Sequence, residues 1–299
     1  MMVAHQTTQL RGTLSRNESM ARHTSWRVGG PARCFYTPAD LDDLANFLAT
    51  LPADEELYWV GLGSNLLVRD GGIPGTVIAT FGGMSDLRLL DDSTVRAEAG
   101  VTCAKLARFM ARQELVGGEF FAGIPGSVGG ALAMNAGAWG GETWQQLLAV
   151  ETIDRHGERH LRRPDEYEIG YRHVRGPADE WFVAAHLRFE KGDSAAAQAR
   201  IKELLERRGA TQPTNLPSCG SVFRNPPGDH AARLIEACGL KGYCIGQACV
   251  SEKHANFIIN TGGARAADIE ALIAHVRDSV EREQGVRLIP EVRIVGVAE

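Results

Sequence analysis

Glycine clustering constrains this sequence more than any other feature. Of its 34 glycines, a dense group lies between residues 117 and 141, and a shorter group follows the apolar run Leu57–Val60. Because glycine lacks a Cβ atom, a backbone rich in it can approach a ligand closely and turn successive N–H groups toward an anion. Tight turns at sheet corners are the alternative, and they are the better interpretation of either segment alone. Both segments together, with interleaved serine and asparagine, favour a nucleotide cofactor.

The first segment does not fit the fingerprint of a Rossmann dinucleotide site. It reads Gly61-Leu-Gly-Ser-Asn-Leu66, so leucine stands where that fingerprint has its third glycine. The fingerprint also opens a helix. Here the chain runs instead into a turn at Asp70-Gly-Gly72. The sequence therefore predicts a nucleotide site of another kind.

Composition narrows the class of protein. The chain has 299 residues, 44% of them hydrophobic, which predicts a folded protein of two domains, or three if one is small. A net charge of -5 and a pI near 6.0 give no general attraction to nucleic acid. No run of eighteen apolar residues occurs, and the first thirty residues contain no secretory core, so we expect no membrane association.

The cysteines predict neither a zinc site nor a redox motif. They form no C-x-x-C pair and no His/Cys zinc spacing, and the sequence contains neither H-E-x-x-H nor a P-loop. We therefore expect no metal. The simplest interpretation is six free thiols, mostly buried, in a reducing cytosol, which makes the expected location cytoplasmic. These residues are Cys34, Cys103, Cys219, Cys238, Cys244 and Cys249.

Helical periodicity and capping signals are clear at three places and weaker at a fourth. Thr37-Pro-Ala-Asp40 predicts the N-cap and first turn of a helix whose apolar face carries Leu41, Leu44, Phe47, Leu48 and Leu51. A second helix begins at Asp193 or Ser194 and is closed by Gly209, and a third ends at Gly285. The weaker helix covers residues 104–112. We expect the second helix to connect an N-terminal half with a C-terminal half.

Strand-like runs lie between these helices without regular alternation. This pattern favours α+β lobes over one doubly wound sheet. Residues 1–22 are polar and aperiodic, and we expect them to form a loose arm. The predicted strands are 57–61, 76–81, 94–99, 148–153, 181–189, 256–260 and 291–295.

Eight segments, in the same order, resemble the UDP-N-acetylenolpyruvoylglucosamine reductase family. Four look like its FAD-binding blocks: His23–Ala32, Gly61–Leu66, Gly123–Gly130 and Met134–Gly137. Four look like its catalytic and substrate blocks: Tyr171-Arg172, Pro217–Pro226, Ser251–Phe257 and Pro290–Arg293. The resemblance runs from about residue 20 to 296. The short connection between Arg172 and Trp181 resembles the shorter of the family's two subtypes.

The resemblance implies an α+β fold in two parts. The first is an FAD-binding module of the vanillyl-alcohol-oxidase (PCMH) type over residues 23–192, in two lobes of roughly 23–82 and 83–192. The second is an α+β substrate-binding domain over 193–299, whose last strand, at about 288–296, is a candidate to return to the FAD module. The implied contacts of a non-covalent FAD are Gly61, Gly63, Ser64, Asn65, Leu66, Gly123, Ile124, Pro125, Gly126, Ser127, Gly129, Gly130, Asn135 and Gly137.

The implied reaction is the NADPH-dependent reduction of UDP-N-acetylglucosamine enolpyruvate to UDP-N-acetylmuramate. This step belongs to peptidoglycan synthesis, and hence to cell-wall biogenesis, cell shape and cell division. The implied partners are NADPH and a UDP-sugar, with no nucleic acid, membrane or metal, and the expected state is a monomer. Two alternatives stay open. One is another PCMH-type FAD oxidoreductase, and the other is a non-catalytic FAD-binding redox sensor that uses Cys219.

The reaction places demands on three residues. Hydride addition to the terminal methylene leaves negative charge that spreads into the carboxylate, so a charge stabiliser and a proton donor are needed. The resemblance gives these roles to Arg172 as stabiliser and Ser221 as donor, while Glu291 hydrogen-bonds the enolate or relays a proton. The residues alone would favour a surface arginine, a turn serine and an exposed glutamate paired with Arg293.

The resemblance also implies substrate contacts, which are Tyr171, Arg224, Asn225 and Lys253. The sequence departs from the family pattern at two places. After Arg172 it continues His173-Val-Arg-Gly176, where the family has a small hydroxyl residue and an aromatic one, and Cys219 stands where a small apolar residue is expected.

Overall fold

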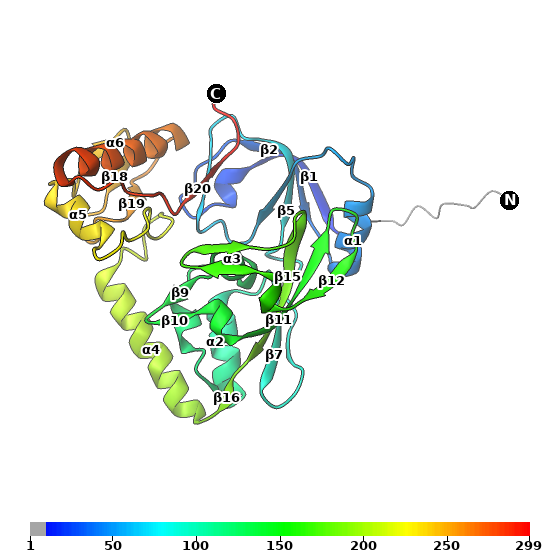
Figure 1. The fold of residues 1–299 in the computed structure, drawn as a ribbon. Coiled ribbons are helices and arrows are strands. Elements are labelled where there is room, and N and C mark those ends of the chain that lie inside the picture. The colour runs from blue at the N-terminus through cyan, green and yellow to red at the C-terminus, as the bar shows by residue number, and fades with distance from the viewer. Residues whose placement is uncertain (1–9) are drawn as a thin grey trace.

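The structure is a computed structural model that describes residues 10–299 (Figure 1). One lobe is a four-stranded sheet in the order β1-β2-β5-β3, in which β2, β5 and β3 are parallel and β1 is antiparallel to β2. Helix α1 packs its apolar face against this lobe. The elements are β1 (Thr13–Ser19), β2 (Pro31–Thr37), α1 (Leu41–Ala49), β3 (Leu57–Val60) and β5 (Ile73–Ala79).

Strand β1 corrects the expectation of a loose arm over residues 1–22. Residues Thr13–Ser19 pair with β2 along the whole strand, from Thr13 opposite Thr37 to Ser19 opposite Pro31. The remaining part of that expectation, residues 1–9, lies outside the described residues. An edge strand is held by main-chain hydrogen bonds and can carry polar side chains on both faces, so apolar alternation gave no signal for it.

The expected start of α1 is also wrong by one turn. Thr37 is still paired in the sheet, and the cap is Asp40, whose carboxylate accepts a hydrogen bond from Asp43 N at 2.9 Å. The proline and alanine between them connect the strand to the helix.

The second lobe is a five-stranded antiparallel sheet in the order β12-β11-β15-β7-β6. Helices α2 and α3 share its apolar core with the connector helix. Helix α3 was not expected, because it is short and contains two glycines. The elements are β6 (Leu87–Leu89), β7 (Thr94–Glu98), α2 (Cys103–Arg112), α3 (Val128–Met134), β11 (Leu147–Asp154), β12 (Arg159–Arg162) and β15 (Glu180–Arg188).

Short paired strands and 3-10 turns complete the two lobes. The paired strands are β8 (Leu115–Val116) with β16 (Glu190–Lys191), β9 (Gly137–Ala138) with β10 (Gly141–Glu142), and β13 (Glu168–Gly170) with β14 (His173–Arg175). The 3-10 turns are Met20–Arg22, Glu119–Gly123, Thr143–Gln146 and Pro164–Glu166.

Helix α4 (Ser194–Thr211) leaves the second lobe and runs to the C-terminal part of the chain, as expected of a connector (Figure 1). The carboxylate of Asp193 caps its start by accepting from Ala195 N and Ala196 N. The helix continues two residues beyond Gly209. The C-terminal part contains α5 (Ala231–Ala237), β17 (Cys244–Ile245), β18 (Ala248–Val250), β19 (Ile258–Asn260) and α6 (Ala266–Gln284).

The last strand joins the two parts of the chain. After α6, strand β20 (Arg293–Val295) pairs in parallel with β4 (Leu66–Val68), which directly follows the first glycine loop. Trp26 adds a second connection, because its buried indole lies in the C-terminal core and donates to Ile258 O at 2.7 Å. The first glycine loop is therefore attached to the C-terminal residues. None of the helices within residues 10–299 is both long and apolar enough to cross a bilayer.

The expectation of six free thiols is wrong at one pair. Cys244 and Cys249 are directly opposite each other in the β17–β18 hairpin and form a disulfide. Their spacing of five residues matches no redox or zinc motif, so only the strand register reveals that the two sulfurs meet. Cys34, Cys103 and Cys219 are free and buried, as expected, and Cys238 is free and half-buried.

Candidate active site

A cleft of about 360 Å³ lies where the two glycine loops meet the start of the C-terminal part. The first loop contributes Leu62 and Ser64, and the second contributes Pro125. The wall opposite comes from the end of α4 and from residues 214–220, which lead directly into Ser221. The cleft thus joins the expected cofactor segments to the expected catalytic segment.

The first glycine loop offers unused donors to this cleft. No acceptor in residues 10–299 takes a hydrogen bond from the main-chain N–H groups of Leu62 to Asn65. A main-chain hydrogen bond holds the loop in place, from Ser25 N to Gly63 O at 3.2 Å. Gly63 is required there: its φ is +60°, and a Cβ would lie 2.0 Å from the carbonyl oxygen of His23. Successive free N–H groups at a cleft form a nest that suits an anion such as a diphosphate.

The second glycine loop does not form such a nest. Its N–H groups are already bonded within the fold: Gly126 to Ile124 O, Val128 to Val101 O, Gly129 to Ala99 O and Gly130 to Ser127 Oγ. The expected inward-pointing donors are therefore absent at these positions, because the segment starts helix α3 and is tied to neighbouring chain. Its glycines instead allow the backbone to pack closely against neighbouring segments. A Cβ on Gly61 would lie 2.2 Å from Ser127 Oγ, so the two loops touch.

Two asparagines expected at the cofactor direct their side chains elsewhere. Asn65 Nδ2 donates to Glu291 O at 3.1 Å and approaches Met134 Sδ at 3.8 Å. Asn135 is 3% exposed, and its amide donates to Glu142 and to Gly170 O. The amide NH2 groups of both residues therefore have partners within the fold, and their cofactor role stays a prediction.

Arg208 is a cleft residue that the sequence reasoning missed. It lies in the last turn of α4, lines the cleft, and its Nε donates to Gln212 Oε1 at 3.1 Å. No carboxylate in the described chain forms an ion pair with it, and burial lowers the pKa of the Arg208 guanidinium. A half-buried guanidinium without an anionic partner suits a diphosphate. The only available signal was its place at the end of the connector helix.

Arg172 is not a surface arginine. It occupies the two-residue turn between β13 and β14, in the left-handed region at φ +54°, where glycine or asparagine is usual. Its Nη2 donates to Gly137 O at 3.3 Å, and its Nε lies 3.2 Å from Glu291 Oε1. Within residues 10–299 the Nε–H makes no hydrogen bond, so this contact is an ion pair with poor donor alignment. The turn thus carries the guanidinium to the C-terminal residues.

Glu291 is buried against that guanidinium and does not form the exposed pair with Arg293. Its side chain is 15% exposed. Burial raises the pKa of the Glu291 carboxyl, while Arg172 and, to a smaller extent, Arg224 act in the opposite direction. Two main-chain bonds fix its position, Glu291 N to Val222 O at 2.7 Å and Asn65 Nδ2 to Glu291 O at 3.1 Å.

Ser221 lies beside these groups. It follows Gly220, whose φ is +79°, and precedes Val222, which accepts the bond from Glu291 N. Ser221 is half-buried, and its hydroxyl makes no hydrogen bond within residues 10–299, so no triad activates it. Cys219 lines the cleft and is 5% exposed. Burial, and then the charge of Glu291, raises the pKa of the Cys219 thiol well above its ordinary value.

The expected substrate contacts fall into two groups. Tyr171 is 53% exposed, and the Arg224 guanidinium has a buried Nε–H without a partner in the described part of the chain, so both are available to contact a ligand. Asn225 and Lys253 already have structural contacts. Asn225 Oδ1 accepts from Ala231 N at the start of α5, and Lys253 Nζ donates to a carbonyl of α4. All four assignments stay predictions.

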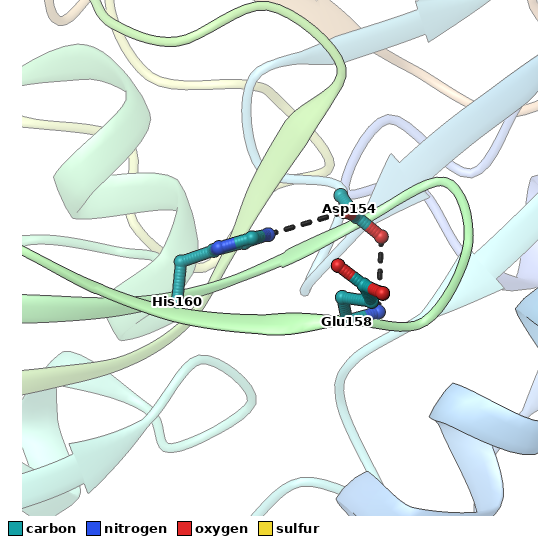
Figure 2. Close-up of side chains that lie close together, drawn as sticks. All are labelled: Asp154, Glu158 and His160. Carbon is teal, nitrogen blue, oxygen red and sulfur yellow. Dashed lines mark hydrogen bonds and ion pairs between the residues drawn. The ribbon is translucent and has the colours of Figure 1, made fainter.

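A group of possible metal ligands lies far along the second sheet, at the turn between β11 and β12. Figure 2 shows Asp154, Glu158 and His160 gathered there. Asp154 Oδ1 accepts from the main-chain N–H groups of His156 and Glu158, and His160 Nε2 bonds Asp154 Oδ2 at 3.1 Å. These hydrogen bonds stabilise the turn, which explains why the three side chains lie together.

Comparison with known protein families finds two matches along the chain. Residues 32–161 match the FAD binding domain family, and residues 212–295 match the C-terminal domain of UDP-N-acetylenolpyruvoylglucosamine reductase. The fold and the cleft therefore define an FAD-binding protein of mixed α+β architecture, as the sequence predicted.

Relatives specify the family. UDP-N-acetylenolpyruvoylglucosamine reductase of Alkalilimnicola ehrlichii is 64% identical over 96% of this chain and 96% of its own. The protein of that name from Methylococcus capsulatus is 61% identical over 97% and 95%. The crystal structure of UDP-N-acetylenolpyruvylglucosamine reductase from Thermus caldophilus superposes with a TM-score of 0.82 at 34% identity, covering 96% of this chain and 99% of that one. The chain belongs to the UDP-N-acetylenolpyruvoylglucosamine reductase family, which confirms the resemblance.

Proposed function

We propose that this chain is an NADPH-dependent flavoenzyme that reduces UDP-N-acetylglucosamine enolpyruvate to UDP-N-acetylmuramate for peptidoglycan synthesis. It is an oxidoreductase acting on a CH–CH bond with NADP as acceptor, and it works in the cytoplasm as a monomer. The observation that carries the proposal is the ion pair of Arg172 and Glu291 beside the segment of Ser221. The names of the relatives support the substrate.

The proposed division of labour follows the proposed domains, residues 23–192 for the cofactor and 193–299 for the sugar nucleotide. FAD fits the cleft because free N–H groups at Leu62 to Asn65 and the unpaired cation of Arg208 suit its diphosphate. When bound, the flavin supplies the hydride that it has taken from NADPH. The chain's own residues must orient the substrate, neutralise the developing charge and deliver a proton.

Arg172 and Arg224 are suited to hold the substrate carboxylate. Each has a buried Nε–H without a hydrogen-bond partner in the described residues. A guanidinium presents donors in a fork that matches a carboxylate, and its attraction grows as negative charge accumulates there. Both groups act on one carboxyl, Glu291, so the cluster has one positive charge in excess. That excess is what an anionic substrate needs.

Ser221 is suited to deliver the proton. Its segment is bonded to Glu291 through Val222, so the two residues belong to one hydrogen-bonded unit of the main chain. Glu291 then stabilises the enolate by a hydrogen bond or passes a proton on. A shared unit of this kind argues against the alternative of another FAD oxidoreductase, for which no such pair is expected.

The second alternative, a redox sensor that uses Cys219, is disfavoured by a specific observation. The reactive form of cysteine is the thiolate, and burial raises the pKa of Cys219 well above its ordinary value. A sensor cysteine needs the opposite environment. Cys219 is better explained as a buried side chain in the cleft wall.

The test of this function separates its two half-reactions. In stopped-flow mixing, NADPH alone should bleach the flavin of the wild type, and UDP-N-acetylglucosamine enolpyruvate should restore its colour. Ser221→Ala should leave the bleaching nearly unchanged and slow the recovery by at least ~10²-fold, the lower end for general acid catalysis. Equal slowing of both steps would assign Ser221 to the flavin site and remove it as the proton donor.

A further inference from the structure

The ionisation state of Glu291 conflicts with its proposed role. A carboxylate only accepts hydrogen bonds, so Glu291 can donate to an enolate oxygen, or relay a proton, only when it is protonated. In the structure it is paired with Arg172 at 3.2 Å, and a nearby cation favours the ionised form. Something must therefore remove that pairing before the chemical step.

The substrate carboxylate is the group able to do so. Arg172 uses one donor on Gly137 O, and its Nε–H is buried beside Glu291 without a hydrogen bond. The existing pair is therefore not the two-bond fork that a free carboxylate can form with a guanidinium. A substrate carboxylate that forms this fork gains better geometry than Glu291 has, because Glu291 is fixed by its main-chain bonds to Val222 and Asn65.

We propose that the substrate carboxylate displaces Glu291 from Arg172 and that Glu291 then takes up a proton from solvent. This inference rests on the proposed function. It concerns one proton and no redox change: the carboxylate of Glu291 becomes a carboxylic acid, and the ion pair passes from Glu291 to the substrate.

The charges around Glu291 support this exchange. The groups that act on it are Arg172 from the β13–β14 turn, Arg224, which follows Ser221, and Cys219, which precedes it. A guanidinium keeps its proton in proteins, and burial holds the pKa of Cys219 well above its ordinary value. Burial also raises the pKa of Glu291, and Arg172 is the stronger of the two influences opposing that rise. Among these groups, Glu291 is thus the one whose protonation responds to substrate.

The exchange also prepares the site for hydride transfer. Without proton uptake, binding of one anion would cancel the single positive charge in excess, and hydride addition would leave the cluster negative. With uptake, the cluster keeps that positive charge until hydride arrives, and the two guanidinium groups then face two negative charges. Stabilising charge that develops only in the transition state is what lowers a barrier.

The experiment measures protons that accompany binding to the FAD-loaded, oxidised protein without NADPH, so that no turnover occurs. UDP-N-acetylglucosamine enolpyruvate is titrated by calorimetry in buffers of different ionisation enthalpy, at several pH values. We expect uptake approaching one proton per site. In the pH range where one proton is taken up, the dissociation constant of this substrate should rise about tenfold for each unit of increase in pH, because binding and proton uptake are linked. UDP-N-acetylglucosamine, which lacks the carboxylate, should bind without uptake.

Two further measurements identify the group. Glu291→Gln should abolish the uptake and the associated pH dependence of binding. If that variant does not fold, the infrared difference spectrum of the wild type should show a protonated carboxyl band that appears on substrate binding. The inference is overturned if the substrate binds and restores the flavin colour but no proton is taken up. Failure to bind, or to restore the colour, would instead reject the proposed function.

Discussion

Gly126→Val tests whether the cleft lined by the two glycine loops holds the cofactor. A Cβ on Gly126 would meet Ser64 Oγ at 3.4 Å and Ile124 at 3.9 Å, which are ordinary contacts, and its φ is not in the left-handed region. Both main-chain groups of Gly126 are already bonded, N to Ile124 O and O to Cys103 N. We therefore expect the valine variant to fold, with a free energy of unfolding within about 0.5 kcal/mol of the wild type before cofactor is added.

The effect on the cofactor should be large. The added side chain points toward Ser64, beside the free N–H groups of Leu62 to Asn65. Loss of two hydrogen bonds to a charged diphosphate, at about 1.5–3 kcal/mol each, would cost about 3–6 kcal/mol. This corresponds to a rise of about 10² to 10⁴ in the dissociation constant of FAD.

The assay is FAD titration of flavin-stripped protein, followed by fluorescence quenching, together with the flavin content on purification. Ala196→Val is the control, because Ala196 is exposed in the first turn of α4, at the end of the helix opposite to Arg208. The reasoning is refuted if Gly126→Val keeps the wild-type flavin content and dissociation constant. Unfolding of that variant would show that the glycine is structural.

Three further predictions concern catalysis and stability. Arg172→Lys should reduce turnover with the enolpyruvyl sugar by about 10²–10³-fold while leaving flavin reduction by NADPH intact, because lysine cannot form the two-bond contact with a carboxylate. Equal effects on both steps would contradict this prediction. Asp43 accepts hydrogen bonds from Tyr36 and two main-chain N–H groups, which hold its pKa low despite burial. The contribution of Asp43 to the free energy of unfolding is therefore present above the unfolded-state pKa and is lost as pH falls through the folded-state pKa. When the free energy of unfolding is measured by denaturant at a series of pH values, it should therefore fall less steeply toward acid pH in Asp43→Asn than in the wild type. Cys249→Ser should lower the free energy of unfolding by about 2 kcal/mol, because it opens a short disulfide loop; unchanged stability would show that the thiols are reduced in solution.

Sequence patterns predicted the elements whose signals are local. The helices α1, α2, α4 and α6 follow from apolar periodicity and caps, and Asp193 and Gly285 mark ends that the structure confirms. Most predicted strands agree within a few residues. Strand β1 and helices α3 and α5 were missed, because a polar edge strand and seven-residue helices carry too little periodicity.

The site was predictable as segments but not as contacts. The resemblance located Ser221, Arg172 and Glu291, yet nothing in their spacing shows that a hairpin turn brings Arg172 to Glu291. Likewise, the two glycine loops look alike in sequence. Only the structure shows that the first leaves its N–H groups free among the described residues, while those of the second are mostly bonded to main-chain carbonyl groups. Such differences depend on partners far along the chain.

The most direct test of the central claim is anaerobic reoxidation of the flavin. Protein reduced with one equivalent of NADPH is mixed with UDP-N-acetylglucosamine enolpyruvate, and the flavin absorption and the sugar product are followed together. The proposed function predicts that oxidised flavin returns as one equivalent of UDP-N-acetylmuramate forms, and that UDP-N-acetylglucosamine gives neither change. A flavin that stays reduced in the presence of the enolpyruvyl sugar would contradict the assignment.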